Sequence, residues 1–230
     1  MNHELITTAD GSHSLYVKDL DEHYHSIHGA IQESLHVFIE TGLHHLRSKG
    51  LQTINILEIG FGTGLNALLT QMEAENLNLK VNYTSLEAYP LNIELLNELN
   101  YVELLSDAEK INESHLKTTF DQLHICDWEK ENKISENFIL QKAKNTLQEI
   151  KFSKTFDLIY FDAFGPRVQP EMWTEELFSK IYAATNSLGC LVTYCAKGEV
   201  KRTLKKVGFV VETLPGPPRK REMVRGTKLI

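Results

Sequence analysis

The sequence has few cysteines and no long hydrophobic run. Its three cysteines form no C-x-x-C pair, and one would stay unpaired in any pairing scheme, so we expect reduced thiols rather than a disulfide framework. No apolar run approaches the roughly 20 residues that a transmembrane helix needs. Residues 1–4 lack the basic and apolar regions of a signal peptide. We therefore predict a cytoplasmic protein that does not act at a membrane.

The chain also lacks an excess of positive charge. Its 230 residues carry 24 Lys and Arg against 31 Asp and Glu, a net charge of −7, which argues against a general polyanion binder. The charge is unevenly distributed, because residues 197–230 hold ten bases and three acids, or +7, which leaves −14 for the rest. A basic end on an acidic body can attract an anionic partner locally. A solvated helix face explains residues 201–206 equally well.

A metal centre is not indicated. His23, His25 and His28 lie close together in the sequence, but no fourth ligand accompanies them. We predict no metal site.

What the sequence does contain is a glycine-rich turn between a strand and a helix. A β-branched apolar stretch at 53–59 runs into Gly60, Gly62 and Gly64, and a helical pattern begins at Leu65. Glycine allows positive φ and lets a cofactor approach the backbone closely. The dinucleotide fingerprint G-x-G-x-x-G would need a small residue where Leu65 stands, so the spacing favours S-adenosylmethionine (SAM). The predicted cofactor contacts here are Glu58, Gly60, Phe61, Gly62, Thr63, Gly64 and Asn66.

Strand and helix patterns alternate along most of the remaining chain. This alternation predicts an α/β fold with right-handed crossovers. Together with the SAM site expected at the glycine loop, and with the family resemblance described below, it implies a Rossmann-like class I SAM methyltransferase architecture. The last two strands have no helix between them, so we expect a mainly parallel seven-stranded sheet with an antiparallel C-terminal strand. The predicted strands are 53–59, 81–87, 137–143, 156–161, 191–195, 209–214 and 223–229, and the predicted helices are 65–75, 91–105, 171–187 and 200–207.

An N-terminal extension precedes this pattern. Residues 4–17 alternate around Asp10-Gly11, a hairpin signal, and an amphipathic helix spans 33–47. We therefore predict an extension over 1–50 and a methyltransferase domain over 51–230. Residues 106–135 are too weakly periodic to assign.

Acidic residues end two of the predicted strands. Glu87 follows Gly64 by 23 residues, and a carboxylate at that strand end can accept both ribose hydroxyls of an adenosyl cofactor. Asp162 ends the fourth predicted strand, beside the first, where a sulfonium and its attacking group would meet. We predict that Asp162 is catalytic and that Asp162 and Ala163 contact the cofactor. A loop-bracing or helix-capping carboxylate is the alternative for Asp162.

The residue that contacts adenine is less well defined. Asn145 follows the third predicted strand, at a position where most such enzymes have Asp. Asp127 and Trp128 offer an alternative register. We favour Asn145 because it leaves the third strand directly before the fourth.

Several segments together resemble the methyltransferase part of the MnmC family. The resemblance spans residues 8–225 except 106–135, and its most specific parts are 161–173 and the Lys-Arg-Glu-Met end of 216–223. It implies that SAM methylates the amine of 5-aminomethyl(-2-thio)uridine at the tRNA wobble position, giving the 5-methylaminomethyl form. The segments that carry it are 10–12, 24–39, 58–66, 87–91, 161–173 and 216–223.

The resemblance also implies partners. The anticodon loop of tRNA would bind, with Arg225 among the candidate phosphate contacts. Larger family members add a FAD oxidoreductase domain, for which this sequence has no second glycine fingerprint. We therefore expect a stand-alone member that follows a separate FAD-dependent or aminomethyl-forming enzyme. Substrate contacts are expected at Tyr24, His25, Phe164, Pro166, Arg219, Lys220 and Arg221.

The sequence departs from the family pattern at two positions, and two other functions are alternatives to tRNA methylation. Asn145 replaces the commoner acid, and Gly165 stands where bifunctional members more often have Ala. The rival functions are an aminopropyltransferase like spermidine synthase, which also uses an adenosyl sulfonium, and a SAM- or tRNA-binding protein without catalysis.

Overall fold

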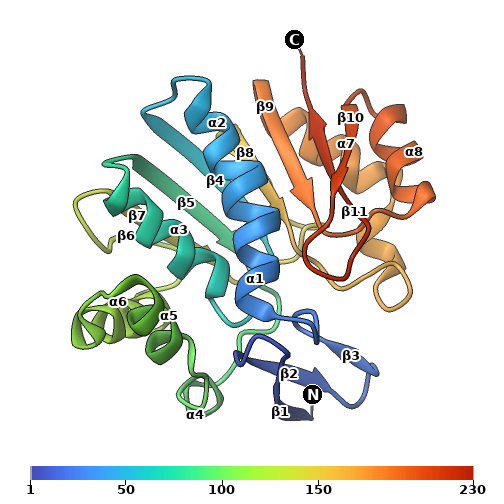
Figure 1. The fold of residues 1–230 in the computed structure, drawn as a ribbon. Coiled ribbons are helices and arrows are strands. Elements are labelled where there is room, and N and C mark those ends of the chain that lie inside the picture. Colours follow the sequence, from blue (N-terminus) through green and yellow to red (C-terminus); the bar gives the residue numbers. More distant parts are fainter. Residues whose placement is uncertain (1, 230) are drawn as a thin grey trace.

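A computed structural model describes residues 2–229. Met1, the first residue of the predicted extension, and Ile230, the last residue of the predicted methyltransferase domain, lie outside the described residues. Its centre is an eight-stranded sheet. Figure 1 shows the long N-terminal helix and α3 over one face and α7 on the other, and a separate apolar core fills each face. The strands in sheet order are β10 (Val210–Pro215), β11 (Glu222–Thr227), β9 (Thr185–Thr193), β8 (Phe156–Phe161), β4 (Thr53–Ile59), β5 (Lys80–Leu86), β7 (Phe138–Ala143) and β6 (Glu131–Lys133).

Strand directions agree with the predicted α/β class. Strands β9, β8, β4, β5 and β7 are mutually parallel, and β11 pairs antiparallel with both β9 and β10. The predicted count of seven strands was wrong by one. Strand β6, only three residues long, pairs antiparallel with β7. It lies in the stretch whose periodicity was too weak to read.

The helices differ from the predicted ones at two places. The predicted helix 91–105 is two helices, because the Asn100 side chain between them bonds to the N-terminal hairpin: it accepts from His13 N at 2.7 Å and donates to Gly11 O at 2.9 Å. The helices are α1 (Ala30–Ser34), the π-helix η1 (Leu35–His44), α2 (His45–Ser48), α3 (Leu65–Asn76), α4 (Ile93–Leu96), α5 (Tyr101–Glu109), α6 (Glu113–Ile125), the 3₁₀ turn η2 (Pro170–Trp173), α7 (Glu175–Ala184) and α8 (Gly198–Lys206).

The second difference is the boundary between α7 and β9. The predicted helix 171–187 ends at Ala184, and β9 starts at Thr185 rather than at residue 191. Leu188 has φ +64°, and backbone bonds with Lys228 hold it and Gly189 against the last strand. Pairing with a distant segment therefore overrides the local helical pattern.

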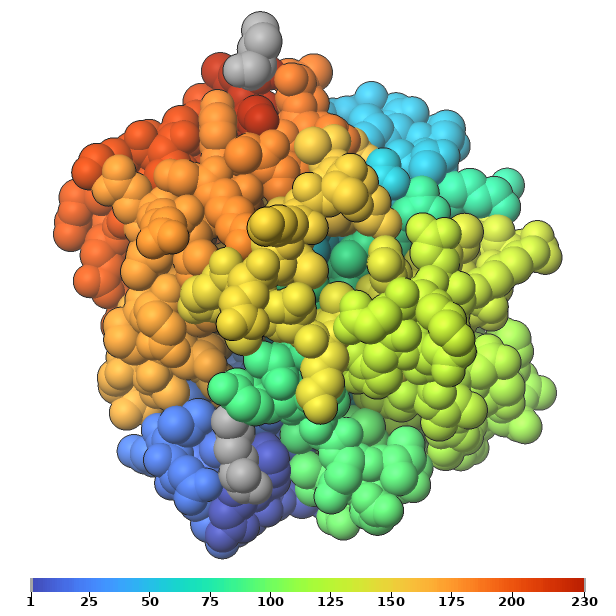
Figure 2. Space-filling view, turned by 180° about the vertical axis from the view of Figure 1, so that it is seen from behind, coloured from blue at the N-terminus to red at the C-terminus, as the bar shows by residue number. Residues whose placement is uncertain are grey.

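The N-terminal segment forms a small sheet that packs on the main body. Strands β1 (His3–Thr7), β2 (His13–Val17) and β3 (Glu22–His23) are antiparallel, which confirms the predicted hairpin. Figures 1 and 2 both place this segment, in blue, beside α4 in green. Leu15 and Val37 belong to the same core cluster as Leu68 of α3. The division at residue 50 stays a prediction.

Across residues 2–229, none of the helices combines the length and apolar character that spanning a bilayer requires. Cys126, Cys190 and Cys195 are free thiols.

Candidate functional site

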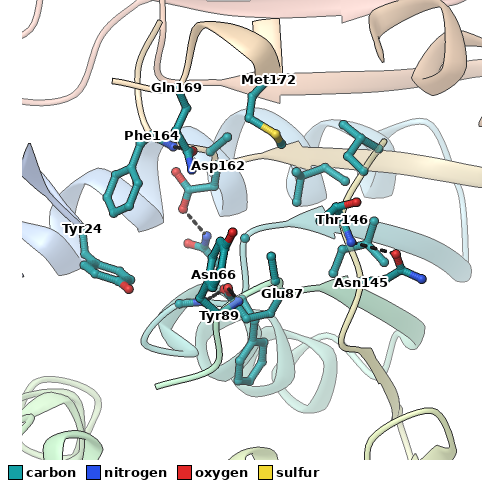
Figure 3. A pocket seen from close by; sticks show the side chains of 18 of the residues that line it. Tyr24, Asn66, Glu87, Tyr89, Asn145, Thr146, Asp162, Phe164, Gln169 and Met172 are labelled. Atoms are coloured by element: carbon teal, nitrogen blue, oxygen red, sulfur yellow. Dashed lines mark hydrogen bonds between the residues drawn. The ribbon is translucent and has the colours of Figure 1, made fainter. Parts of the chain in front are cut away.

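The carboxyl ends of β4, β5, β7 and β8 surround one cavity. Its volume is about 370 Å³, within the range of about 300–1,000 Å³ typical of small-molecule sites. The parallel strands bring the ends of distant sequence segments to one edge, where the ligand site of a doubly wound sheet is expected. Figure 3 shows Tyr24 and Phe164 on one side of this pocket, Asn145 and Thr146 on the other, and Asp162 near Asn66 between them.

The glycine loop after β4 forms the base of the pocket. Gly60, Gly62 and Gly64 have φ values of +94°, +51° and +75°, so all three use the left-handed region. A Cβ on Gly60 would lie 3.0 Å from the Asp162 carbonyl oxygen, and one on Gly62 would lie 3.2 Å from the Tyr24 ring. The loop is thus fitted between Asp162 and Tyr24, with no room for a side chain.

Gly64, the last glycine of the loop, and Glu58, which precedes the loop, do not line the cavity. A Cβ on Gly64 would lie 2.8 Å from the His124 ring. Glu58 is fully buried, and Ser85 Oγ donates to its Oε2 at 2.7 Å. Burial raises the pKa of Glu58 to about 8, so its carboxyl group is mostly protonated at neutral pH. Both residues were predicted to contact the cofactor, but neither lies at the cavity.

Glu87 is held from both sides at the end of β5. Its Oε2 accepts a hydrogen bond from Gly62 N at 2.9 Å, and its Oε1 accepts one from Tyr89 N at 2.8 Å. An ionised carboxylate has about four lone-pair sites, so these two bonds leave acceptor capacity for a ligand. Glu87 thus couples the glycine loop to the pocket.

Asp162 sits where the two halves of the pocket meet. Asn66 Nδ2 donates to its Oδ2 at 2.9 Å. Burial, reinforced by the nearby carboxyl groups of Glu33 and Glu58, raises the pKa of Asp162 well above its ordinary value, while the Lys220 ammonium opposes this rise. Ala163, which follows it, also lines the cavity. A carboxyl group whose pKa is raised by burial and by neighbouring carboxyl groups is a candidate for proton transfer.

Aromatic and imidazole groups close the side of the pocket opposite Asn145 and Thr146. The rings of Tyr24 and Phe164 meet edge to face, with centroids 5.2 Å apart. His25 lies between Ser14 Oγ at 3.2 Å and Thr63 Oγ1 at 3.4 Å. Burial lowers the pKa of His25 to about 4, so the ring is neutral at neutral pH.

Asn145, rather than Asp127, lies at the cavity. Asn145 and Thr146 line it, and Asn145 Oδ1 accepts from Thr146 N at 2.8 Å. Asp127 is exposed and pairs with Lys130, and the Trp128 ring lies 4.7 Å from the Lys142 ammonium; neither lines the pocket. Contact of Asn145 with adenine remains a prediction.

Four predicted substrate residues and the predicted phosphate contact Arg225 lie outside the cavity lining. Pro166 follows the pocket segment 162–164, and Arg219 and Arg221 are exposed on the β10–β11 loop. Lys220 turns inward and forms an ion pair with Glu33, so its placement does not fit the predicted contact with the substrate. Arg225 lies within β11, where its Nε donates to Glu212 Oε2 at 2.9 Å, which does not fit a phosphate contact either.

Some lining residues were not predicted from the sequence. Gln169 and Met172 belong to the family-specific segment 161–173, so that segment already carried a signal for them. Gln169 Oε1 accepts from Phe164 N at 3.2 Å and so holds the aromatic wall. Tyr89 likewise belongs to the family segment 87–91, whereas residues 147–149 had no such signal, because their role depends on how the chain turns after a strand.

Comparison with known proteins identifies relatives. A family described as S-adenosyl-L-methionine-dependent methyltransferase matches residues 106–229. The chain is 30% identical over 221 residues to the tRNA 5-methylaminomethyl-2-thiouridine biosynthesis bifunctional protein MnmC of Idiomarina loihiensis, covering 90% of this chain and 35% of that protein. The MnmC of Leptospira borgpetersenii is 30% identical over 215 residues, covering 90% of this chain and 32% of that protein. The chain thus spans about a third of the length of these relatives.

A solved structure is also similar to this chain. The crystal structure of MNMC2 from Aquifex aeolicus superposes with a TM-score of 0.75 and 26% identity, covering 98% of this chain and 70% of that one. The predicted fold is confirmed.

Proposed function

The chain belongs to the family of S-adenosyl-L-methionine-dependent methyltransferases, and on that basis we propose that it methylates the amine of 5-aminomethyluridine, with or without a 2-thio group, at the wobble position of tRNA. The observation that carries the proposal is the position of Asp162. It lies between the glycine loop and the aromatic pair Tyr24 and Phe164, where a methyl donor and an amine would meet. The names of the relatives supply the substrate.

The residues present fit a SAM cofactor. The glycines of the loop lack the Cβ atoms that would collide with neighbouring residues, so a cofactor can approach the loop backbone closely. Glu87, beside the loop, keeps free acceptor sites. Glu87 would hold the ribose, Asn145 the adenine, and the loop Gly60–Gly62 the remainder. When bound, SAM supplies an electrophilic methyl group on a positively charged sulfur.

Asp162 would prepare the nucleophile. An amine attacks only through its lone pair, so it must lose its extra proton before transfer. The Asp162 carboxylate accepts a hydrogen bond from the amine and takes that proton, and Asn66 fixes the carboxylate through Oδ2. The deprotonated amine would then be free to accept the methyl group that SAM would supply, and the thioether would be the leaving group. Holding the two reactants at about 3–3.5 Å is the main contribution that the pocket can make.

Recognition of the base would use the aromatic wall. A modifying enzyme reaches a wobble base by turning it out of the anticodon loop and stacking it on aromatic side chains. Tyr24 and Phe164 line the pocket, and Tyr89, 63% exposed, also contributes to its lining. Acting on tRNA would place the protein in the cytoplasm. The relatives are named bifunctional, so we propose that a separate FAD-dependent or aminomethyl-forming enzyme acts upstream.

The decisive test incubates the chain with labelled SAM and tRNA that carries 5-aminomethyluridine, followed by nucleoside analysis. We expect label in 5-methylaminomethyluridine and none with tRNA that has unmodified wobble uridine. Putrescine with decarboxylated SAM is the parallel reaction for an aminopropyltransferase and should give no product. Folded protein that binds SAM but leaves the aminomethyl tRNA unlabelled would refute the proposal.

Arg219 and Arg221 are the proposed phosphate contacts. Both are exposed on the loop at the pocket edge of the sheet. Replacing both with alanine should weaken tRNA binding and reduce the slope of log K against log salt by about 1 per lost contact. Arg219 has φ +67°, and alanine keeps the Cβ, so its backbone is no more strained than before.

Fluorescence anisotropy of a labelled anticodon stem-loop over a KCl series measures this slope. Lys117→Ala, on the exposed surface of α6, is the matched control and should leave the slope unchanged. An identical slope for the double variant and the control would show that these arginines do not contact phosphate.

A further inference from the structure

The β10–β11 loop turns Lys220 inward beside the site. Gly216 N donates to Arg221 O at 3.2 Å, which closes the turn, and a Cβ on Gly216 would lie 2.6 Å from the Lys220 carbonyl oxygen. Strands β10 and β9 run in the same direction, so the loop after β10 lies at the same sheet edge as the pocket. Lys220 is thus directed toward the protein, while Arg219 and Arg221 stay exposed.

The Lys220 ammonium joins two parts of the chain behind the pocket. It forms an ion pair with Glu33, whose side chain is only 9% exposed. The second Glu33 oxygen, Oε2, accepts from Ser26 N at 2.8 Å, next to the pocket residue His25. Glu33 therefore links the loop to the N-terminal segment that supplies Tyr24 and His25.

The same ammonium also contacts the segment that carries Asp162. It lies 4.9 Å from the centroid of the Tyr194 ring, a cation–π contact. The Tyr194 hydroxyl donates to Ala163 O at 2.9 Å, directly after Asp162. Lys220 itself does not line the cavity.

We propose that Lys220 is a positioning residue of this site: through Glu33 and Tyr194 it holds the N-terminal wall and the Asp162 segment in register with each other. A buried carboxylate such as Glu33 needs a cation beside it, and the loop provides one from 187 residues away in the sequence. The proposal also accounts for the Lys in the segment 216–223. Its activity readouts depend on the proposed function, because they measure methyl transfer to the amine.

Lys220 also acts on Asp162 electrostatically. The Glu33 carboxylate opposes ionisation of Asp162, and so does Glu58 to the extent that it is ionised, although its carboxyl group is mostly protonated at neutral pH. The Tyr83 and Tyr194 phenols are neutral neighbours, since burial raises their pKa values. Lys220 is the cation among them and favours the Asp162 carboxylate. Without it, Asp162 should need a higher pH to ionise.

The test compares Lys220→Met, which keeps the apolar stem, with Lys220→Arg, which keeps the charge. Lys206→Met is the matched control, because Lys206 also pairs with a glutamate, Glu175 at 2.6 Å, but both side chains are mostly exposed. For Lys220→Met we expect kcat to fall about 10- to 100-fold through misalignment of the reacting groups. The pH of half-maximal kcat should rise, and the Kd for S-adenosylhomocysteine by calorimetry should stay within about 3-fold. Lys220→Arg should recover most of kcat.

The outcomes separate this inference from the proposed function. Equal kcat and pH profiles for Lys220→Met and Lys206→Met would overturn the positioning role. The role would also be overturned if Lys220→Met lowered cofactor affinity and melting temperature along with kcat, since a general loss of this kind indicates a merely structural ion pair. If the wild type transfers no methyl, the proposed function fails on its own. In that case the positioning role is tested by amide hydrogen exchange of residues 161–165 with S-adenosylhomocysteine bound. These amides should exchange faster in Lys220→Met but not in Lys206→Met. Unchanged exchange in Lys220→Met would overturn the positioning role.

Discussion

Replacing Asp162 with asparagine should lower kcat by about 10²- to 10⁴-fold, the range typical for loss of a general base. Asparagine has the same size and can still accept the hydrogen bond from Asn66 Nδ2, so the pocket should keep its shape. What it cannot do is take a proton from the amine. The Kd for SAM, measured by calorimetry, should change by no more than about 3-fold, because the lost interaction concerns the amine rather than the cofactor.

The pH dependence gives this prediction a second test. Burial raises the pKa of Asp162, so the carboxylate fraction, and with it the wild-type kcat, should increase as the pH rises through that pKa. Single-turnover methyl transfer over a pH series measures this. In the pH profile of Asp162→Asn, the increase in kcat that comes from ionisation of Asp162 should be absent, and only the increase from titration of the substrate amine should remain. Asp121→Asn, on α6 away from the pocket, should match the wild type. A kcat for Asp162→Asn within about 3-fold of the wild type would reject the general-base role.

Replacing Glu87 with alanine should weaken SAM binding by about 10²-fold or more, since a charge-assisted hydrogen bond is worth about 1.5–3 kcal/mol and two functions are lost together. The first function is the proposed bond to the ribose hydroxyls. The second is the brace on the glycine loop, because Glu87 accepts from both Gly62 N and Tyr89 N. Without the carboxylate, those two N–H groups need new partners and the loop loses its fixed position.

Glu87→Gln separates the two functions. The glutamine amide has one oxygen, so it can replace one of the two acceptors, while its NH₂ group would face the other N–H donor. We expect an intermediate Kd for SAM by calorimetry. Glu94→Gln, exposed on the neighbouring α4, is the control and should bind like the wild type. Wild-type affinity for Glu87→Ala would show that this carboxylate does not hold the cofactor.

Local sequence was sufficient for the elements that repeat a simple pattern. Strand β4 matches its predicted bounds, and α3 differs from its predicted bounds by one residue, because a β-branched run, three glycines and a helical period follow one another without a break. The acids Glu87 and Asp162 could be placed for a related reason. Parallel strands end at one edge, so a residue that ends a strand is at the pocket wherever the chain goes next.

Where distant segments compete for the same residues, local pattern was not sufficient. The helix predicted over 171–187 gave way to β9 at Thr185, where the backbone pairs with β8 and, at Leu188 and Gly189, with Lys228. The helix predicted over 91–105 divided because Asn100 bonds to the N-terminal hairpin. Neither partner is near in the sequence.

The same distinction applies within the site. The order of residues along the chain specified the sheet, the glycine loop and the two acids, because those depend on periodicity and on short-range spacing. Which way a side chain turns depends instead on what packs against it. Glu58 pairs with Ser85 instead of lining the pocket, and Lys220 joins Glu33, because burial leaves a charged or polar group only the partners that the folded chain brings to it.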